Sequence, residues 1–209
     1  VGLGFVSLYE LTFDSRWISR AREIALSMIQ WFWDDELDAF FDTPGDAEKL
    51  ISRPRDAGDN AVPSGTSLAV DLLLCLGELL HDDEMKRRAV FVLETVGSAI
   101  IRYPGSFGHM LGVADMAANG AVEVAIAGTP GEKNFRAMEH ELAARYVPSL
   151  VLAGGSDTAT VALMDGRSAP RGKAVSYVCR SYSCDEPATS PAPFASQLEV
   201  AGQVTTSLV

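Results

Sequence analysis

The sequence predicts a mainly α-helical protein with a small C-terminal βαβ unit. Up to residue 120, apolar side chains recur every three or four positions, the spacing that places them on one face of a helix. From residue 121 on, short apolar runs flank one amphipathic segment, the order typical of two parallel strands joined by a helix. We therefore expect a helical-hairpin part (1–120), a small α/β appendage (121–195) and an irregular tail (196–209).

We expect the chain to open inside a helix. Val1, Phe5 and Leu8 already follow helical spacing. A helix whose apolar face forms at once implies upstream partners, so we expect a fragment of a longer protein. We also expect this face to be exposed, or covered by self-association with a second copy.

The next elements are a helix and a hairpin. Asp14 is a suitable N-cap for a helix that runs to about Trp33, with Trp17, Ala21, Ile24, Met28 and Phe32 on its apolar side. In the segment 43–46, Pro and Gly occupy the positions that a type II turn favours. A hairpin between 39–41 and 48–51 is therefore predicted.

Two long helices follow. Residues 65–80 are apolar nearly all round, which predicts an inner helix buried on most faces, with Ser64 as its N-cap. Residues 82–100 are amphipathic and predict an outer helix. Ser106 is expected to cap a further helix that ends near Ala118.

The C-terminal part reads as strand, helix, strand and one further strand. The strands are predicted at 122–127, 149–153 and 174–179, and the helix at 132–146. Prolines at 187, 191 and 193 indicate an irregular end.

Composition and charge exclude some classes of partner. The 209 residues are 47% hydrophobic and 22% charged, as in ordinary globular proteins, and the net charge is −11. This balance disfavours nucleic acid and anionic membranes, which bind basic surfaces. No apolar run reaches the roughly 18 residues of a membrane span, and no signal-peptide pattern opens the chain. Together with only three cysteines, this predicts a cytoplasmic protein.

The loop RPRDAGDNAVPSGTS at 53–67 is the main candidate site. One interpretation is structural: Ser64 caps the helix, Asp59 lies near the positive helix end, and arginines pair with aspartates. The other is a ligand site, because one cap does not need so many polar groups. Asp56 and Asp59 would then be the catalytic acid and base, and a ligand would be bound by Arg53, Arg55, Asn60, Ser64, Ser67 and His109.

Other motifs give weaker signals. The sequence GTPGEK at 128–133 resembles a phosphate-binding loop but lacks its Gly-Lys-Ser/Thr ending. Cys179 and Cys184 have neither redox nor zinc-site spacing and are predicted to be free thiols, and Cys75 is predicted to lie in the core. The three histidines have no metal-ligand spacing. No metal or cofactor is predicted.

Five segments carry a family resemblance: FFDT at 40–43, RPRDAGDNAVPSGTSLA at 53–69, SFGHML at 106–111, VEVAIAG at 122–128 and YVCRSYSC at 177–184. In this order they resemble the C-terminal half of the thioredoxin-domain-containing proteins related to spermatogenesis-associated protein. This sequence has Arg55 where the family usually has Lys, and Thr66 where it has Asn.

The resemblance implies a thioredoxin-like domain upstream and an (α/α)6 toroid similar to N-acylglucosamine 2-epimerases and six-hairpin glycosidases. This chain would keep the last hairpins of the toroid. Because helix starts line one mouth of such toroids, the loop would then bind or process a sugar-like ligand. The alternative is a non-catalytic scaffold or partner-binding module for the thioredoxin-like domain.

Overall fold

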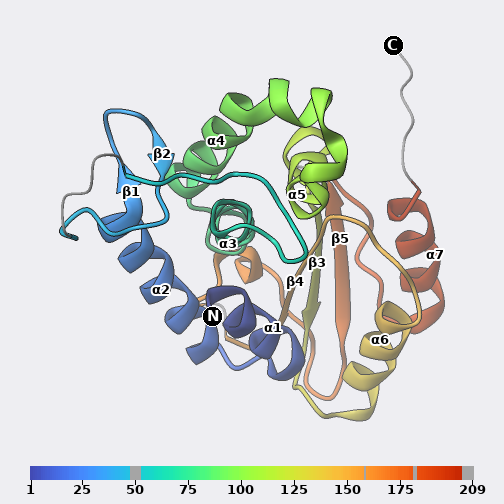
Figure 1. Cartoon of the computed structure of the whole chain (residues 1–209). Helices are drawn as coiled ribbons and strands as arrows, with labels where there is room; N and C mark the ends of the chain where they lie inside the picture. The colour runs from blue at the N-terminus through green and yellow to red at the C-terminus, as the bar shows by residue number, and fades with distance from the viewer. Residues whose placement is uncertain (48–52, 158, 181–182, 204–209) are drawn as a thin grey trace.

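The computed structural model describes residues 1–47, 53–157, 159–180 and 183–203. Its described part is mainly α-helical, as predicted. Helices lie on both sides of a small sheet: α1 to α5 form a body on one side, and α6 and α7 cover the other (Figure 1). The helices are α1 (Gly2–Thr12), α2 (Arg16–Phe32), α3 (Gly65–Leu80), α4 (Asp83–Arg102), α5 (Gly108–Asn119), α6 (Lys133–Ala143) and α7 (Pro191–Ala201).

The sheet confirms the predicted βαβ unit. Its strands, in the order β4-β3-β5-β6, are β3 (Val122–Ala127), β4 (Leu150–Gly155), β5 (Val175–Arg180) and β6 (Ser183–Cys184). Strands β3 and β4 are parallel and are joined through α6, whereas β5 runs antiparallel to β3. One apolar cluster continues from the helical body through the sheet to α6 and α7.

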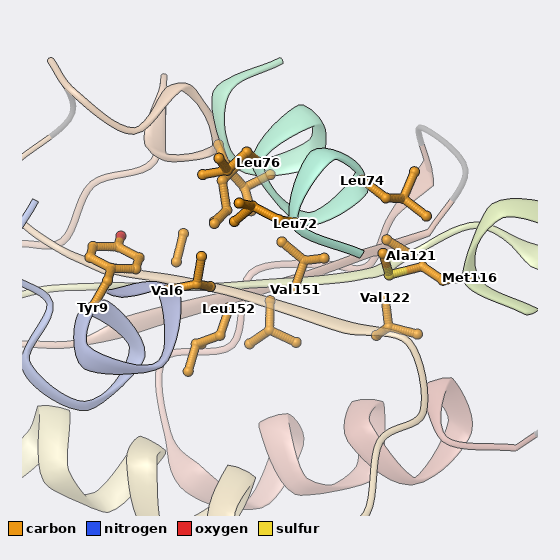
Figure 2. Packing of buried hydrophobic residues seen from close by; sticks show 14 of the residues in the cluster. Val6, Tyr9, Leu72, Leu74, Leu76, Met116, Ala121, Val122, Val151 and Leu152 are labelled. Carbon is orange, nitrogen blue, oxygen red and sulfur yellow. The ribbon is translucent and has the colours of Figure 1, made fainter. Parts of the chain in front are cut away.

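Helix α3 is the inner helix that its composition predicts. Its bounds are those predicted, and Leu73 and Leu76 are completely buried. It packs against α4, α5, α2 and α1. Leu72 and Leu76 point toward Val151 of β4, with Val6 of α1 nearby (Figure 2). The apolar surface of α3 therefore joins the helices to the sheet.

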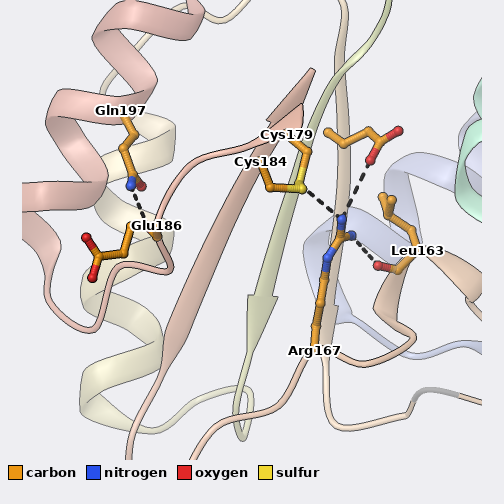
Figure 3. The surroundings of a disulfide bond; sticks show 7 residues. Leu163, Arg167, Cys179, Cys184, Glu186 and Gln197 are labelled. Atoms are coloured by element: carbon orange, nitrogen blue, oxygen red, sulfur yellow. Dashed lines mark hydrogen bonds and ion pairs between the residues drawn. A yellow bond between two sulfur atoms is a disulfide. The ribbon is translucent and has the colours of Figure 1, made fainter. Parts of the chain in front are cut away.

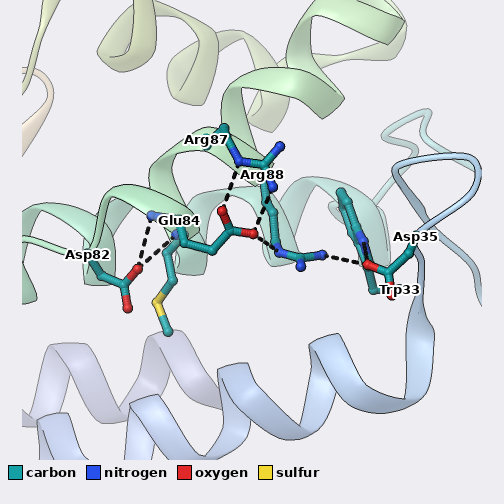
Figure 4. Close-up of polar contacts among 7 residues, drawn as sticks. Trp33, Asp35, Asp82, Glu84, Arg87 and Arg88 are labelled. Carbon is teal, nitrogen blue, oxygen red and sulfur yellow. Dashed lines mark hydrogen bonds and ion pairs between the residues drawn. The ribbon is translucent and has the colours of Figure 1, made fainter.

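Helix α4 is amphipathic, as predicted, and is anchored at its start. The Asp82 carboxylate accepts the N–H groups of Glu84 and Met85, both at 3.1 Å. Arg88 bonds Glu84 at 2.8 Å and lies over the Trp33 ring, 4.8 Å from its centroid (Figure 4). These contacts attach α4 to the hairpin that follows α2.

That hairpin differs from the predicted one. Strand β2 (Ala39–Phe40) pairs with β1 (Trp33–Asp34), which precedes it. The Asp34 carboxylate accepts the N–H groups of Glu36 and Leu37, both at 3.1 Å, and so stabilises a turn that the sequence analysis missed. The predicted partner strand at 48–51 lies outside the described residues.

Two helix starts are shifted from the predicted positions. Ser15, not Asp14, is the N-cap of α2, although Asp14 accepts the N–H of Arg16 at 3.1 Å. The buried side of α2 is formed by Ile18, Ala21 and Ala25, so of the predicted apolar side only Ala21 is fully buried. Ser106 ends a short 3₁₀ turn (Pro104–Ser106) and does not cap α5.

The prediction of an irregular C-terminal end is wrong for residues 191–201, because they form α7. Pro191 and Pro193 fall in its first turn, where backbone N–H groups have no helical partner and the missing N–H of proline costs no hydrogen bond. Phe194 and Leu198 of α7 are buried. The prolines that suggested a break therefore mark a helix start, and residues 204–209 lie outside the described part.

Cys179 and Cys184 form a disulfide, so the prediction of free thiols is wrong. Antiparallel pairing of β5 and β6 places the two residues directly opposite each other, with their Cα atoms 4.0 Å apart. Arg167 points toward the sulfur of Cys179 at 3.2 Å (Figure 3). Disulfides persist mainly in oxidising compartments, so the small number of cysteines no longer supports a reducing one. Cys75 is partly buried and packs against the core.

The N-terminal helix exposes much of its apolar face. Val1 is 91% exposed, Leu11 75% and Leu8 37%. Phe5 differs, because its ring stacks on Trp17 with centroids 5.7 Å apart. On the opposite side the Tyr9 hydroxyl lies 3.3 Å from the carbonyl of Gly154, and burial raises the pKa of Tyr9 to about 12. Among the described residues, no helix has both the length and the apolar character to cross a bilayer.

Replacing Leu76 by Ala tests the inner position of α3. We expect a loss of about 2 to 5 kcal/mol in the free energy of unfolding, because the side chain is fully buried and leaves a cavity. Leu68→Ala on the same helix is the control, since Leu68 is 39% exposed, and should cost less than about 1 kcal/mol. Equal losses in denaturant melts would contradict the inner placement.

Candidate functional site

Asp59 is the centre of the charged loop and joins two helices. The residue is 8% exposed. One carboxylate oxygen accepts the N–H of Ser64 at 2.8 Å and the hydroxyl of Ser67. The other accepts the N–H groups of His109 and Met110, at 2.9 and 3.0 Å. The first pair of donors lies at the start of α3 and the second at the start of α5, so Asp59 caps both helices.

The surroundings of Asp59 keep it ionised. Burial raises its pKa, but the hydrogen bonds from Ser67, Met110, Ser64 and His109 outweigh that effect and hold the pKa below its usual range. Two positive helix ends add to this preference for the charged form. A carboxylate with both oxygens occupied by four donors has neither a proton to give nor a free lone pair for a substrate. Its geometry is therefore that of a structural cap.

Ser64 and Ser67 are also used within the cap. The Ser64 hydroxyl oxygen accepts the N–H of Ser67 at 3.0 Å, which makes Ser64 the N-cap of α3, as predicted. Ser67 is fully buried beneath Asp59. These hydroxyls face the loop itself.

Arg53 is bound to the backbone of the neighbouring hairpin segment. Its guanidinium donates to the carbonyl of Thr43 at 2.8 and 3.0 Å and to that of Trp31 at 3.3 Å. It also lies 4.4 Å from the centroid of the Phe41 ring. The carboxylate near it is Asp34, at 3.8 Å, and not an aspartate of the loop.

The other candidate residues of the loop, Arg55, Asp56 and Asn60, are exposed. Asp56 accepts the N–H of Gly58 at 2.9 Å and forms a local turn, while its own N–H donates to Asp42 at 3.0 Å. Arg55 and Asn60 are on the surface. The structure thus brings Asp59, Ser64, Ser67 and the backbone of His109 together, and leaves Asp56, Arg55 and Asn60 at the periphery.

The His109 side chain belongs to a second group, which sequence reasoning missed. Its Nε2 lies 3.0 Å from Asp71 of α3, and the other Asp71 oxygen accepts the thiol of Cys75 at 3.4 Å. Burial and the nearby Asp71 raise the pKa of Cys75 well above its usual value, so the thiol stays protonated. Burial and Asp71 also raise the pKa of Glu10. Asp71, an acidic residue within an apolar helix, was the available sequence signal.

An aromatic pocket lies beside the charged loop. It has a volume of about 270 Å³ and lies where α2, β2 and the start of α3 meet. Three phenylalanines form its wall, with Asp42 and Thr66 as polar groups. Part of the lining comes from the segment FFDT at 40–43. No local sequence pattern indicates that residues of α2 also contribute to it. The lining residues are Met28, Phe32, Phe40, Phe41, Asp42, Gly65, Thr66 and Ala69.

The charged loop is hydrogen-bonded to two residues that line this pocket. The Thr66 hydroxyl donates to the carbonyl of Asp56 at 3.2 Å, and Asp42 accepts the N–H of Asp56. The other Asp42 oxygen has no hydrogen-bond partner in the part of the chain that the structure describes. In that same part, no three His, Cys, Asp or Glu side chains are arranged to hold a metal ion.

Replacing Asp59 by Asn tests its role as a double cap. Asn places an NH₂ group against N–H donors, so we expect a loss of about 2 to 4 kcal/mol in the free energy of unfolding. Because folding lowers the pKa of Asp59, its contribution is complete above the unfolded-state pKa of about 4 and is lost as the pH falls through the folded-state pKa.

Asp56→Asn is the matched control and should change stability by no more than about 0.5 kcal/mol. Denaturant melts of both variants at neutral pH make the comparison. A small loss for Asp59→Asn would leave its carboxylate free for another role.

Comparison with known proteins gives distant relatives. No protein-family model matches the chain. The chain is 23% identical over 195 residues to spermatogenesis-associated protein 20 of human, and equally to the mouse and rat proteins. The match covers 90% of this chain and 25% of each relative, so the chain spans about a quarter of the length of these curated relatives. The chain is thus distantly similar to part of spermatogenesis-associated protein 20.

Proposed function

We propose that this chain is a non-catalytic binding module that holds a sugar-like ligand in the aromatic pocket. The observation that carries the proposal is the wall formed by Phe32, Phe40 and Phe41, with Asp42 and Thr66 as polar groups in the same lining. Small-molecule sites are typically apolar clefts with a few polar groups that fix orientation. A sugar ring has this character, since its C–H faces pack on aromatic rings while its hydroxyls need hydrogen-bond partners.

The polar groups of the pocket suit hydroxyls. Asp42 is exposed, and one of its carboxylate oxygens has no hydrogen-bond partner among the described residues. That oxygen can accept hydrogen bonds from hydroxyl donors. Thr66 is 2% exposed and directs its hydroxyl to Asp56, so it fixes the rim of the pocket. The volume of about 270 Å³ suits a small ligand.

The two loop aspartates are not placed as an acid–base pair, and this supports binding without hydrolysis. Glycosidases use two carboxylic acid groups on either side of the bond that is cleaved. In this chain Asp59 is occupied as a cap, and Asp56 is exposed in a local turn. Within the full-length protein, we propose that the helices form the last hairpins of an (α/α)6 toroid, where another hairpin would complete the wall of the pocket.

A second candidate function is a partner-binding module for an upstream thioredoxin-like domain. It is favoured by the exposed apolar face of α1 at Leu8 and Leu11. Leu11 also borders an apolar hollow of about 380 Å³ between α1, α6 and β4. In the isolated chain, we propose that this surface drives self-association.

Titration with saccharides tests the principal proposal. We expect a panel of monosaccharides and their N-acetylated forms to contain a binder, measured by calorimetry. Phe41→Ala should weaken that binding at least tenfold, because Phe41 forms part of the wall. Trp31→Ala is the matched control, since Trp31 is a 40% exposed aromatic residue next to the pocket wall that does not line it. Absence of any binder, or equal weakening in both variants, would contradict the proposal.

Sedimentation of the isolated chain tests the second candidate. We expect association that grows with concentration, and its loss in Leu8→Glu/Leu11→Glu, because charges on the α1 face oppose burial. Ile101→Glu is the control, since Ile101 is 84% exposed on α4. A wild-type chain that stays monomeric at high concentration would count against an apolar docking surface on α1.

A further inference from the structure

A cationic cavity lies at one end of the sheet, away from the charged loop. It has a volume of about 190 Å³. Its lining includes Gly128 after β3, Gly155 at the end of β4, and residues 167–173 before β5. Because β5 runs antiparallel to β3, its beginning lies beside the end of β3, where Ala127 pairs with Val175. Ligands of open α/β sheets bind in this position, outside the carboxyl ends of parallel strands.

The backbone there is arranged so that the strand ends come close together. The N–H of Gly128 donates to the carbonyl of Gly155 at 3.2 Å. Gly128 has φ +144°, and a Cβ on it would lie 2.9 Å from the carbonyl oxygen of Lys173. Only glycine therefore fits at this close approach. The ends of β3 and β4 and the beginning of β5 therefore enclose the bottom of the cavity.

The charges of the lining contrast with those of the whole chain. The chain carries a net charge of −11, yet Arg167, Arg171 and Lys173 line this cavity and no carboxylate does among the described lining residues. Arg167 is engaged, with Glu123 at 3.6 Å and the sulfur of Cys179 at 3.2 Å. Arg171 and Lys173 are exposed and have no side-chain partner in the described part of the chain.

Hydroxyl donors complete the lining. Thr129 and Ser156 follow the ends of β3 and β4, and neither hydroxyl has a hydrogen-bond partner among the described residues. Two cationic side chains and two free hydroxyls are donors suited to the several oxygens of a phosphoryl group, which arginine binds bidentately. The volume lies below the 300 to 1,000 Å³ typical of drug-sized ligands. This size favours one phosphoryl group with a small substituent over a nucleotide.

We infer that this cavity is a binding site for a phosphoryl group, carried by inorganic phosphate or a small phosphate monoester. The site differs from a nucleotide-binding loop of the kind that GTPGEK resembles, since Gly128 and Thr129 line the cavity but residues 130–133 do not. It is also independent of the aromatic pocket. Either site can therefore fail its test without the other.

Amide chemical-shift titration of the whole chain tests the inference. The probes are inorganic phosphate, glycerol 3-phosphate and succinate, each at constant ionic strength. We expect saturable shifts at Thr129 and Ser156 with both phosphates, and tighter binding of one of the two identifies the natural form. Tighter binding of succinate than of either phosphate would overturn the assignment of a phosphoryl group.

Two double variants separate a specific site from general charge. Arg171→Ala/Lys173→Ala should weaken phosphate binding at least tenfold and leave the remaining amide spectrum unchanged, because both side chains are exposed. Arg20→Ala/Arg102→Ala removes the same charge outside the cavity and should change affinity less than twofold. Equal weakening in both variants, or shifts that do not saturate, would overturn the inference.

Discussion

The buried carboxylate of Asp59 is the constraint on which the helical body depends. It takes four hydrogen-bond donors from the starts of two helices whose sequence positions differ by more than 40 residues. Burying a charge is unfavourable unless it is hydrogen-bonded, and these four donors offset that cost. These hydrogen bonds fix the start of α5 against the start of α3. Helix α3 in turn packs on α4 and on the sheet. The charged loop is thus held, through Asp59, by the starts of both helices.

This use of Asp59 shapes the functional interpretation. The loop residues that could form an acid–base pair are instead a cap and an exposed turn. The space for a ligand lies beside them, where Phe41 and Asp42 face the start of α3. At one end of the sheet, the cationic cavity is lined by the loops that follow β3 and β4 and by residues 167–173. In both places a rigid scaffold presents loop residues, as is common for binding sites.

Local patterns in the sequence predicted much of the fold. The all-round apolar run predicted the bounds of α3, and the amphipathic pattern of residues 82–100 predicted α4, whose buried side includes Met85, Ala89 and Val92. The short apolar runs at β3, β4 and β5 predicted the sheet, because a buried strand leaves a continuous signal. These elements could be predicted because their buried faces appear in the sequence as regularly spaced or continuous apolar residues.

The remaining features depend on contacts between distant residues. The donors of His109 and Met110 lie 50 and 51 positions from Asp59, so no local spacing assigns it to α5. The Cys179–Cys184 disulfide follows from the pairing of β5 with β6, not from the spacing of the cysteines alone. The aromatic pocket draws on Phe32 from α2 and Thr66 from α3, which only the tertiary structure brings together. The position of the charged loop before α3 could be predicted from the sequence, but the bonds from Asp59 to the start of α5 could not.

Titration of the Asp59 carboxyl by NMR tests the central claim most directly. The account predicts a carboxyl pKa below the ordinary value of about 3.9, with the amide signals of Ser64, His109 and Met110 changing at the same midpoint. These three amides report on both helix starts at once. A pKa at or above the ordinary value, or amide signals that do not follow the carboxyl group, would contradict the double cap.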